Sequence, residues 1–270
     1  MPTLDPVEIG EHVCWIVDPA LGHQGYKAVT STFLADGELF GDKVVIVGSL
    51  LDTSAFTGGT RGAVVVDPRS AGADAAAGIG SMLGLVRREA DRAGRQGYRA
   101  LRVLAVMDEL VPPGVDVDEL LAHELRLDEF VADREAIVVC AYGGDRFGAA
   151  LGHVACVHHL ELESEPRRSA PSFRMYNSGP GVWSVCGAVD ADGAEVFRAA
   201  LVTAAALAPT LRLRFDELEL MDAAGMRALV EAATHSRVRR ITVEGANATV
   251  RLCWEMLGYG TYDVPVELAR

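Results

Sequence analysis

The sequence lacks the features that mark several large classes of protein. Residues 1–6 contain no cationic segment followed by an apolar run, so we predict no signal peptide. No apolar stretch has the length of a membrane-spanning helix, and the longest candidate, Ala199–Ala208, is far too short. We therefore expect a cytoplasmic protein that does not enter a membrane.

Positive charge is also scarce. The chain has 25 Lys and Arg residues against 38 Asp and Glu residues, which gives a formal net charge of −13. Nucleic acids and anionic membrane surfaces are polyanions and would be repelled by this charge. The composition therefore argues against both as partners, whereas a basic protein partner remains compatible with it.

The cysteines indicate neither disulfides nor a metal motif. The chain has 5 of them, an odd number, no Cys-x-x-Cys pair occurs, and each lies in an apolar run. We expect reduced, buried cysteines, and we predict no metal ligands and no cofactor. An alternative hypothesis is a metal or haem sensor, because thiolate and imidazole groups are available from His12, Cys14, Cys156 and His158.

A polar break divides the 270 residues into two parts. Glu161–Ser172 has two prolines, mixed charge and few apolar side chains, which is typical of a linker. We predict one domain at 1–161, a linker at 162–172 and a second domain at 173–270.

In the first part, short β-branched runs alternate with segments of helical periodicity. This alternation predicts an α/β fold with a mostly parallel sheet. The predicted strands are His12–Val17, Lys43–Val47, Gly62–Val66, Leu101–Met107 and Ala136–Ala141, and the predicted helices are Lys27–Asp36, Gly78–Ala93, Asp116–Phe130 and Arg146–His158.

The loop Asp18–Lys27 occupies the place where a nucleotide triphosphatase would hold phosphate. The pattern G-x-x-x-x-G-K-[ST] is absent, and Ala28 follows Lys27, so no hydroxyl is available there for magnesium. Asp108 follows an apolar strand and could act as the acidic residue of such a site. We predict that the chain is not an enzyme. A degenerate nucleotide-binding, ATPase-like enzyme, with Lys27 as a ligand-binding residue, is the alternative.

Five short motifs occur in order along this first part. They are His12–Trp15, Phe33–Val45, Gly97–Val103, His123–Phe130 and Val139–Tyr142. In this order they resemble the MEDS sensory domain, which occurs in regulators of methanogens, methylotrophs and actinobacteria.

The MEDS resemblance covers roughly 6–161 and implies a degenerate relative of RecA/KaiC-type ATPases that senses a small ligand. The polar residues that it implies for ligand binding are His12, Glu124, Tyr142 and either His158 or His159. Structural roles are the alternatives, with Tyr142 capping a strand and Glu124 lying on a solvated helix face.

The second part has a different pattern of three strands and three helices. The predicted strands are Trp183–Val189, Leu211–Met221 and Arg240–Val243, and the predicted helices are Glu195–Ala206, Met226–Ala233 and Ala248–Leu257. This order resembles the STAS domain of anti-sigma-factor antagonists. The resemblance rests on Gly187–Asp190 and on the strand-to-helix loop Asp222-Ala223-Ala224-Gly225.

In STAS proteins this loop commonly reads Asp-Ser-Ser-Gly, and a kinase phosphorylates a serine that corresponds to Ala223. Ala223 and Ala224 carry no hydroxyl, so this chain cannot be switched there by phosphorylation. Asp222 is expected to cap the following helix, and Gly225 to allow close backbone packing. We predict a docking loop formed by Asp190 and Asp222–Met226, the alternative being a turn that has lost docking.

Together the two resemblances imply a regulatory protein. A sensor domain would be coupled to an interaction domain that binds an anti-sigma factor or a related signalling protein and so controls a sigma-factor pathway of transcription. A small-molecule ligand in the first domain and a homodimer are further implications, since both families often self-associate.

Overall fold

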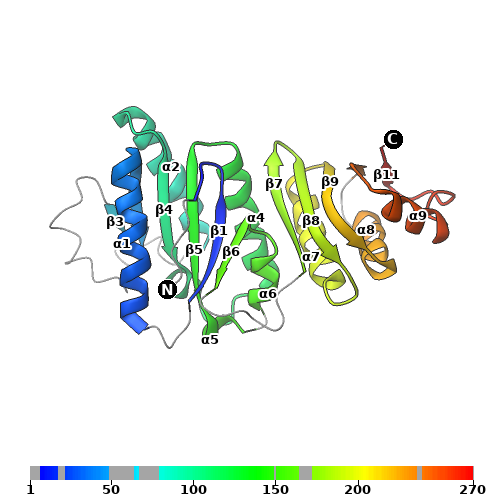
Figure 1. The fold of residues 1–270 in the computed structure, drawn as a ribbon, viewed down its shortest axis with the longest axis horizontal. Helices are drawn as coiled ribbons and strands as arrows, with labels where there is room; N and C mark the ends of the chain where they lie inside the picture. Colours follow the sequence, from blue (N-terminus) through cyan, green and yellow to red (C-terminus); the bar gives the residue numbers. More distant parts are fainter. Residues whose placement is uncertain are drawn as a thin grey trace. The chain divides into compact units, whose positions relative to one another are not determined.

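A computed structural model of the chain describes residues 7–17, 22–48, 64–66, 79–148, 150–163, 172–235 and 239–269, the side chains of 22–29 excepted. The chain folds into two units, each built on its own β-sheet (Figure 1). The first sheet, sheet A, has six parallel strands, and the second, sheet B, has five strands of mixed direction. The α/β fold class predicted from the sequence is confirmed.

Sheet A has the strand order β3-β2-β4-β5-β1-β6. Its strands are β1 (His12–Val17), β2 (Lys43–Val47), β3 (Val64–Val66), β4 (Leu101–Val106), β5 (Ala136–Gly143) and β6 (Leu160–Glu163). The helices between and beside these strands are α1 (Gly22–Phe40), α2 (Gly80–Gln96), α3 (Met107–Leu110), α4 (Val117–Ala132), α5 (Gly144–Phe147) and α6 (Ala150–Ala155).

The inner strands of sheet A are buried on both faces. Every residue of β1, β2 and β4 is buried, as is every residue of β5 except its last. Strands covered on both faces need apolar side chains at successive positions, which is why these segments are continuous β-branched runs rather than alternating ones. The polar His12 is thereby held inside the sheet at 0% exposure.

The end of this first part differs from the prediction. The helix expected at Arg146–His158 is two short helices, α5 and α6, and α6 ends at Ala155. Gly148 has φ of +50°, in the region that favours glycine, and it ends α5. After α6 the chain turns, and Leu160–Glu163 pairs with β1 as strand β6. The polar break at Glu161–Ser172 therefore begins within a strand of sheet A.

Sheet B has the order β11-β10-β9-β8-β7, with β7 antiparallel to β8 and the other pairs parallel. Its strands are β7 (Phe173–Gly179), β8 (Val182–Val189), β9 (Thr210–Met221), β10 (Arg240–Glu244) and β11 (Val266–Leu268), and its helices are α7 (Ala194–Leu207), α8 (Ala223–His235) and α9 (Ala248–Met256). The sequence did not predict β7 and β11.

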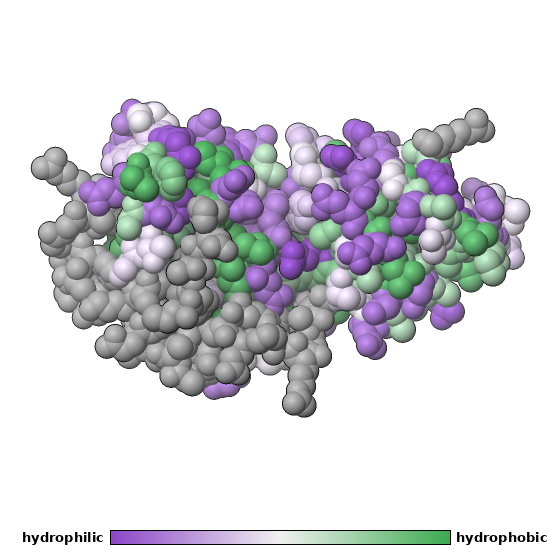
Figure 2. Space-filling model, in the orientation of Figure 1, coloured by the Kyte–Doolittle hydropathy of each residue, from purple (hydrophilic) through white to green (hydrophobic). Residues whose placement is uncertain are grey.

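The core of this unit comes from alternate residues of the strands and one face of each helix. β9 alternates buried and exposed residues through Phe215, and the register then shifts along its pairing with β8. Phe197 of α7 packs edge-on against Phe173 of β7, with 5.5 Å between ring centroids. Helix α9 exposes Leu252 and Met256. Figure 2 shows hydrophobic residues on the surface over this helix.

Candidate functional site

His12 and Cys140 lie side by side on sheet A. His12, the first residue of β1, pairs with Val138, so Cys140, two residues further along β5, faces the same side of the sheet. His12 Nε2 is 3.4 Å from Cys140 Sγ, and neither side chain is exposed. An imidazole and a thiol therefore meet in a buried position.

Glu124 and His158 form a second buried pair. Glu124 lies in the middle of α4, and His158 lies just after α6. Glu124 Oε2 is 3.2 Å from His158 Nε2, and both side chains are 0% exposed. His158 Nδ1 lies 2.6 Å from the carbonyl oxygen of Val154. Since a carbonyl oxygen only accepts hydrogen bonds, Nδ1 carries a proton, and Nε2 is the nitrogen that faces the carboxylate.

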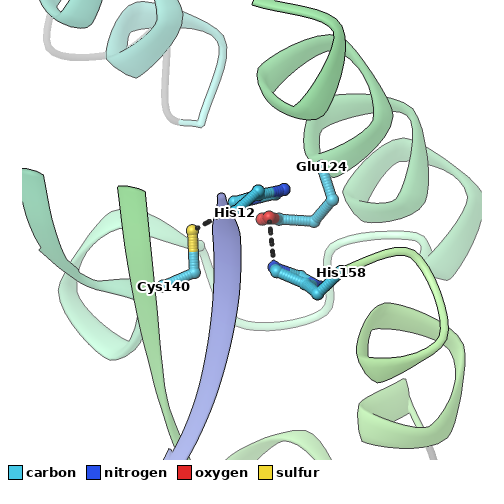
Figure 3. Close-up of side chains that lie close together, drawn as sticks. All are labelled: His12, Glu124, Cys140 and His158. Carbon is cyan, nitrogen blue, oxygen red and sulfur yellow. Dashed lines mark hydrogen bonds and ion pairs between the residues drawn. The ribbon is translucent and has the colours of Figure 1, made fainter. Parts of the chain in front are cut away.

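The two pairs form one cluster, shown in Figure 3. One donor atom from each of the four side chains lies within 4.8 Å of all the others. The set consists of two imidazole nitrogens, one carboxylate oxygen and one thiol sulfur. We call these residues the buried donor cluster: His12, Glu124, Cys140 and His158.

The loop between β9 and α8 has the geometry of a capped helix start. Asp222 Oδ1 accepts hydrogen bonds from the backbone nitrogens of Ala224, at 2.8 Å, and Gly225, at 2.9 Å. These are two of the N–H groups that a helix leaves unpaired at its start, so Asp222 is the N-cap of α8, as predicted. The backbone nitrogen of Asp222 donates to the carbonyl of Val189 at 3.1 Å, which fixes the loop against β8.

Gly225 packs closely against the neighbouring backbone, as predicted. A Cβ on Gly225 would lie 2.8 Å from the Val189 carbonyl oxygen, so only glycine fits there without a shift. Ala223 is exposed, whereas Met226 is buried. Asp190 accepts a hydrogen bond from the backbone nitrogen of Gly193 at 3.0 Å and shapes the turn before α7.

A family model described as MEDS, the methanogen/methylotroph, DcmR sensory domain, matches residues 11–159, more than half of the chain. The chain belongs to the MEDS family. A second family model, STAS_2 (Mlab, STAS domain), matches residues 177–265, so both resemblances and their order along the chain are confirmed. Comparison with curated proteins finds no match.

A MEDS sensory domain followed by a STAS domain indicates a signalling or regulatory protein. STAS domains generally interact with partner signalling proteins. Across the described part of the chain, no helix has both the length and the apolar character that crossing a membrane requires.

Within the MEDS domain, the structure brings together three of the residues predicted for ligand binding. His12, Glu124 and His158 are all members of the buried donor cluster. The alternative that Glu124 lies on a solvated helix face is wrong, because its side chain is 0% exposed.

The other predicted residues of the MEDS domain have different positions. His159 accepts a hydrogen bond at Nδ1 from the backbone nitrogen of His12, at 3.2 Å. Tyr142 is buried and packs edge-on against Phe147, with ring centroids 4.9 Å apart, so it is a packed residue of β5. The side chain of Lys27 and residues 18–21 before it lie outside the described residues.

Sequence spacing did not predict the cluster as a donor set. Cys140 was not among the predicted site residues, and Cys14 and Cys156, which the metal hypothesis used, are not members of the cluster. Cys156 instead donates a hydrogen bond to the carbonyl of His153 at 3.1 Å. Cys140 lies two residues before Tyr142, a predicted site residue, so the two share one face of the strand. Connecting Cys140 with His12 requires the strand order, which brings β5 next to β1.

Proposed function

We propose that the STAS_2 domain docks an anti-sigma factor or a related signalling protein without a phosphorylation switch, and so controls a sigma-factor pathway. The MEDS domain supplies the input by binding a ligand. The observation that carries this proposal is the intact, capped start of α8, with an exposed alanine at its first position.

The geometry of this loop supports a docking role. Asp222 and Gly225 keep the strand-to-helix turn in shape, while Ala223 presents a small apolar side chain at the end of the helix. A phosphate there would add nearly two negative charges and change how a partner docks. Alanine excludes that modification, so the loop corresponds to the unphosphorylated form, which by family resemblance is the form that binds partners.

The residues around the loop favour a partner with basic and apolar groups. Glu219 and Leu220, the last residues of β9 before Met221, are both exposed. Asp222 adds a second acidic group, next to the exposed Ala223. An acidic rim beside apolar side chains complements a partner surface with the opposite charge. The net charge of −13 adds long-range attraction for such a partner.

The proposal includes no catalytic reaction. Asp108, the acidic residue that a nucleotide enzyme would use, accepts a hydrogen bond from the backbone nitrogen of Gly143 at 2.8 Å. This contact joins the end of β4 to the end of β5 and gives Asp108 a structural role.

The test compares the full chain with two matched variants in affinity capture from an extract of the host, with captured proteins identified by mass spectrometry. Ala223→Asp places a charge at the first position of α8. Ala248→Asp places the same charge at the equivalent position of α9, after its own N-cap Asn247. A carboxylate at a helix N-terminus does not destabilise the helix, so folding is preserved in both variants.

We expect an anti-sigma factor or related signalling protein to be captured by the wild-type chain and by Ala248→Asp, and to be lost with Ala223→Asp. Capture of no such protein, or equal capture by Ala223→Asp, would contradict the proposal.

A further inference from the structure

The buried donor cluster has the composition of a transition-metal site. We propose that His12, Glu124, Cys140 and His158 bind one Zn²⁺ ion with tetrahedral coordination. Zinc is bound in proteins by imidazole nitrogen, thiolate sulfur and carboxylate oxygen, and this cluster supplies four such ligand atoms. The sulfur also argues against Mg²⁺ and Ca²⁺, which prefer oxygen ligands.

The distances between the donor atoms fit this coordination. Zinc–ligand bonds of about 2.0–2.3 Å place the ligand atoms of a tetrahedral site about 3.3–3.8 Å apart. The His12–Cys140 pair is separated by 3.4 Å, and the Glu124–His158 pair by 3.2 Å. Since all four atoms lie within 4.8 Å of one another, small side-chain movements are enough to close the remaining edges.

The orientation of His158 is that of a metal ligand. Its Nδ1–H group donates to the Val154 carbonyl, which directs Nε2 toward the cluster. Metal-binding histidines commonly donate their other ring N–H to a backbone carbonyl, because that bond fixes the tautomer and the ring. Nε2 faces a carboxylate oxygen at 3.2 Å, so a cation must lie between these two atoms, either a proton or a metal ion.

The charge balance favours the metal in this setting. All four side chains are fully buried. A divalent ion bound to one thiolate, one carboxylate and two neutral imidazoles has no net charge, whereas separate charges in a buried site are costly. With four protein ligands the coordination is complete, as in structural zinc sites, so the ion would set the stability and conformation of this domain rather than activate water.

The test measures metal in the full chain, purified without a metal-affinity step. Elemental analysis is expected to show about one zinc per chain, as follows from a single four-ligand site. After removal of zinc with a chelator, Co²⁺ is added as a spectroscopic probe, because tetrahedral cobalt with a thiolate ligand has intense visible bands and a sulfur-to-metal charge-transfer band. We expect both in the wild-type chain.

Two cysteine variants locate the site. Cys140→Ser is expected to abolish the charge-transfer band, whereas Cys14→Ser is expected to retain it, although Cys14 is also buried and pairs with Cys140 in the β1–β5 ladder. Glu124→Gln keeps the thiolate band but is expected to weaken zinc binding at least as much as the loss of an outer-shell partner does, which is about 10- to 100-fold.

The proposal is overturned if the wild-type chain holds no zinc and gives no tetrahedral cobalt spectrum. It is equally overturned if the cobalt spectrum lacks the thiolate band, or if Cys14→Ser removes that band. If Cys140→Ser does not fold, the wild-type cobalt spectrum and the Glu124→Gln titration still decide the question. Partner capture is measured separately, so either proposal can fail without the other.

Discussion

At the scale of single residues, Asp222 determines whether the start of α8 keeps its shape. Its carboxylate oxygen accepts two backbone hydrogen bonds at 2.8 and 2.9 Å. Losing an N-cap of this kind costs about 1 kcal/mol of folding stability, because the freed N–H groups have no other partner in the helix. The cap therefore preserves the loop, although Ala223 and Ala224 carry no hydroxyl.

We predict that Asp222→Ala lowers the free energy of unfolding of the STAS_2 domain by about 1 kcal/mol, measured by urea denaturation of the full chain. Asp222→Asn is the control, because its side-chain oxygen can still accept both hydrogen bonds, and it should cost only a few tenths of a kcal/mol. An equal loss in both variants would show that the charge, rather than the cap, is what stabilises the loop.

Single residues also show where the sequence is informative and where it is not. The capping role of Asp222 could be predicted because the two N–H groups that donate to it lie within three residues in the chain. Cys140 could not, because its partner His12 is 128 residues away and the contact exists only once β5 lies beside β1.

At the scale of elements, α2 is joined to β2 by a buried ion pair. Lys43 Nζ lies 2.9 Å from Glu89 Oε2, and the two side chains are only 6% and 4% exposed. Burial alone would raise the pKa of Glu89, but the hydrogen bonds and positive charges of Lys43 and Arg92 outweigh it and hold this pKa below the ordinary value of 4.5. The ionised form is therefore the one that stabilises the fold.

This ion pair gives a pH-dependent prediction. Because the pKa of Glu89 is lowered in the folded state, its contribution is complete above about pH 4.5 and is lost as the pH falls through the folded-state pKa. Glu89→Gln leaves Lys43 buried without its counter-ion, so we expect it to reduce the unfolding free energy by about 3 kcal/mol at neutral pH. The difference from wild type should shrink in acid.

The matched control for this experiment is Glu195→Gln, which breaks the ion pair with Arg198 on α7. That glutamate is 71% exposed, and its pKa is lowered chiefly by the hydrogen bond from Arg198. Exposed pairs of this kind contribute at most about 0.5 kcal/mol. A loss of similar size in both variants, or no dependence on pH for Glu89→Gln, would show that the buried pair does not stabilise the fold.

Two of the strands that the sequence did not predict, β6 and β11, share a physical cause. β11 has three residues, too few for a recognisable period, and β6 begins in a segment whose composition is that of a linker. Both become strands because a parallel neighbour, β10 or β1, offers hydrogen-bonding partners. By contrast β1 and β2 were predicted to the residue, because a strand buried on both faces needs a continuous apolar run.

At the scale of the whole molecule, the chain joins a MEDS sensory domain to a STAS_2 domain. The phosphorylatable hydroxyl is missing from the STAS_2 loop, and a buried set of four donor groups lies within residues 12–158 of the MEDS match. In the function that we propose, the input therefore comes from the sensory domain. The output, in this account, is docking of a partner at the start of α8.

The exposed face of α9 is the other surface to which a partner could bind. Leu252 and Met256 lie four residues apart on that helix and are 57% and 78% exposed. A measurement that locates the docked partner therefore has to distinguish the start of α8 from α9.

Hydrogen–deuterium exchange of the full chain, with and without a saturating amount of the captured partner, makes this distinction. We expect the partner to slow exchange at the backbone amides of residues 222–226, beyond the protection that the Asp222 cap already gives, and to leave exchange in α9 unchanged. Binding that slows exchange in α9 and not at 222–226 would contradict the claim that the α8 loop is the docking surface.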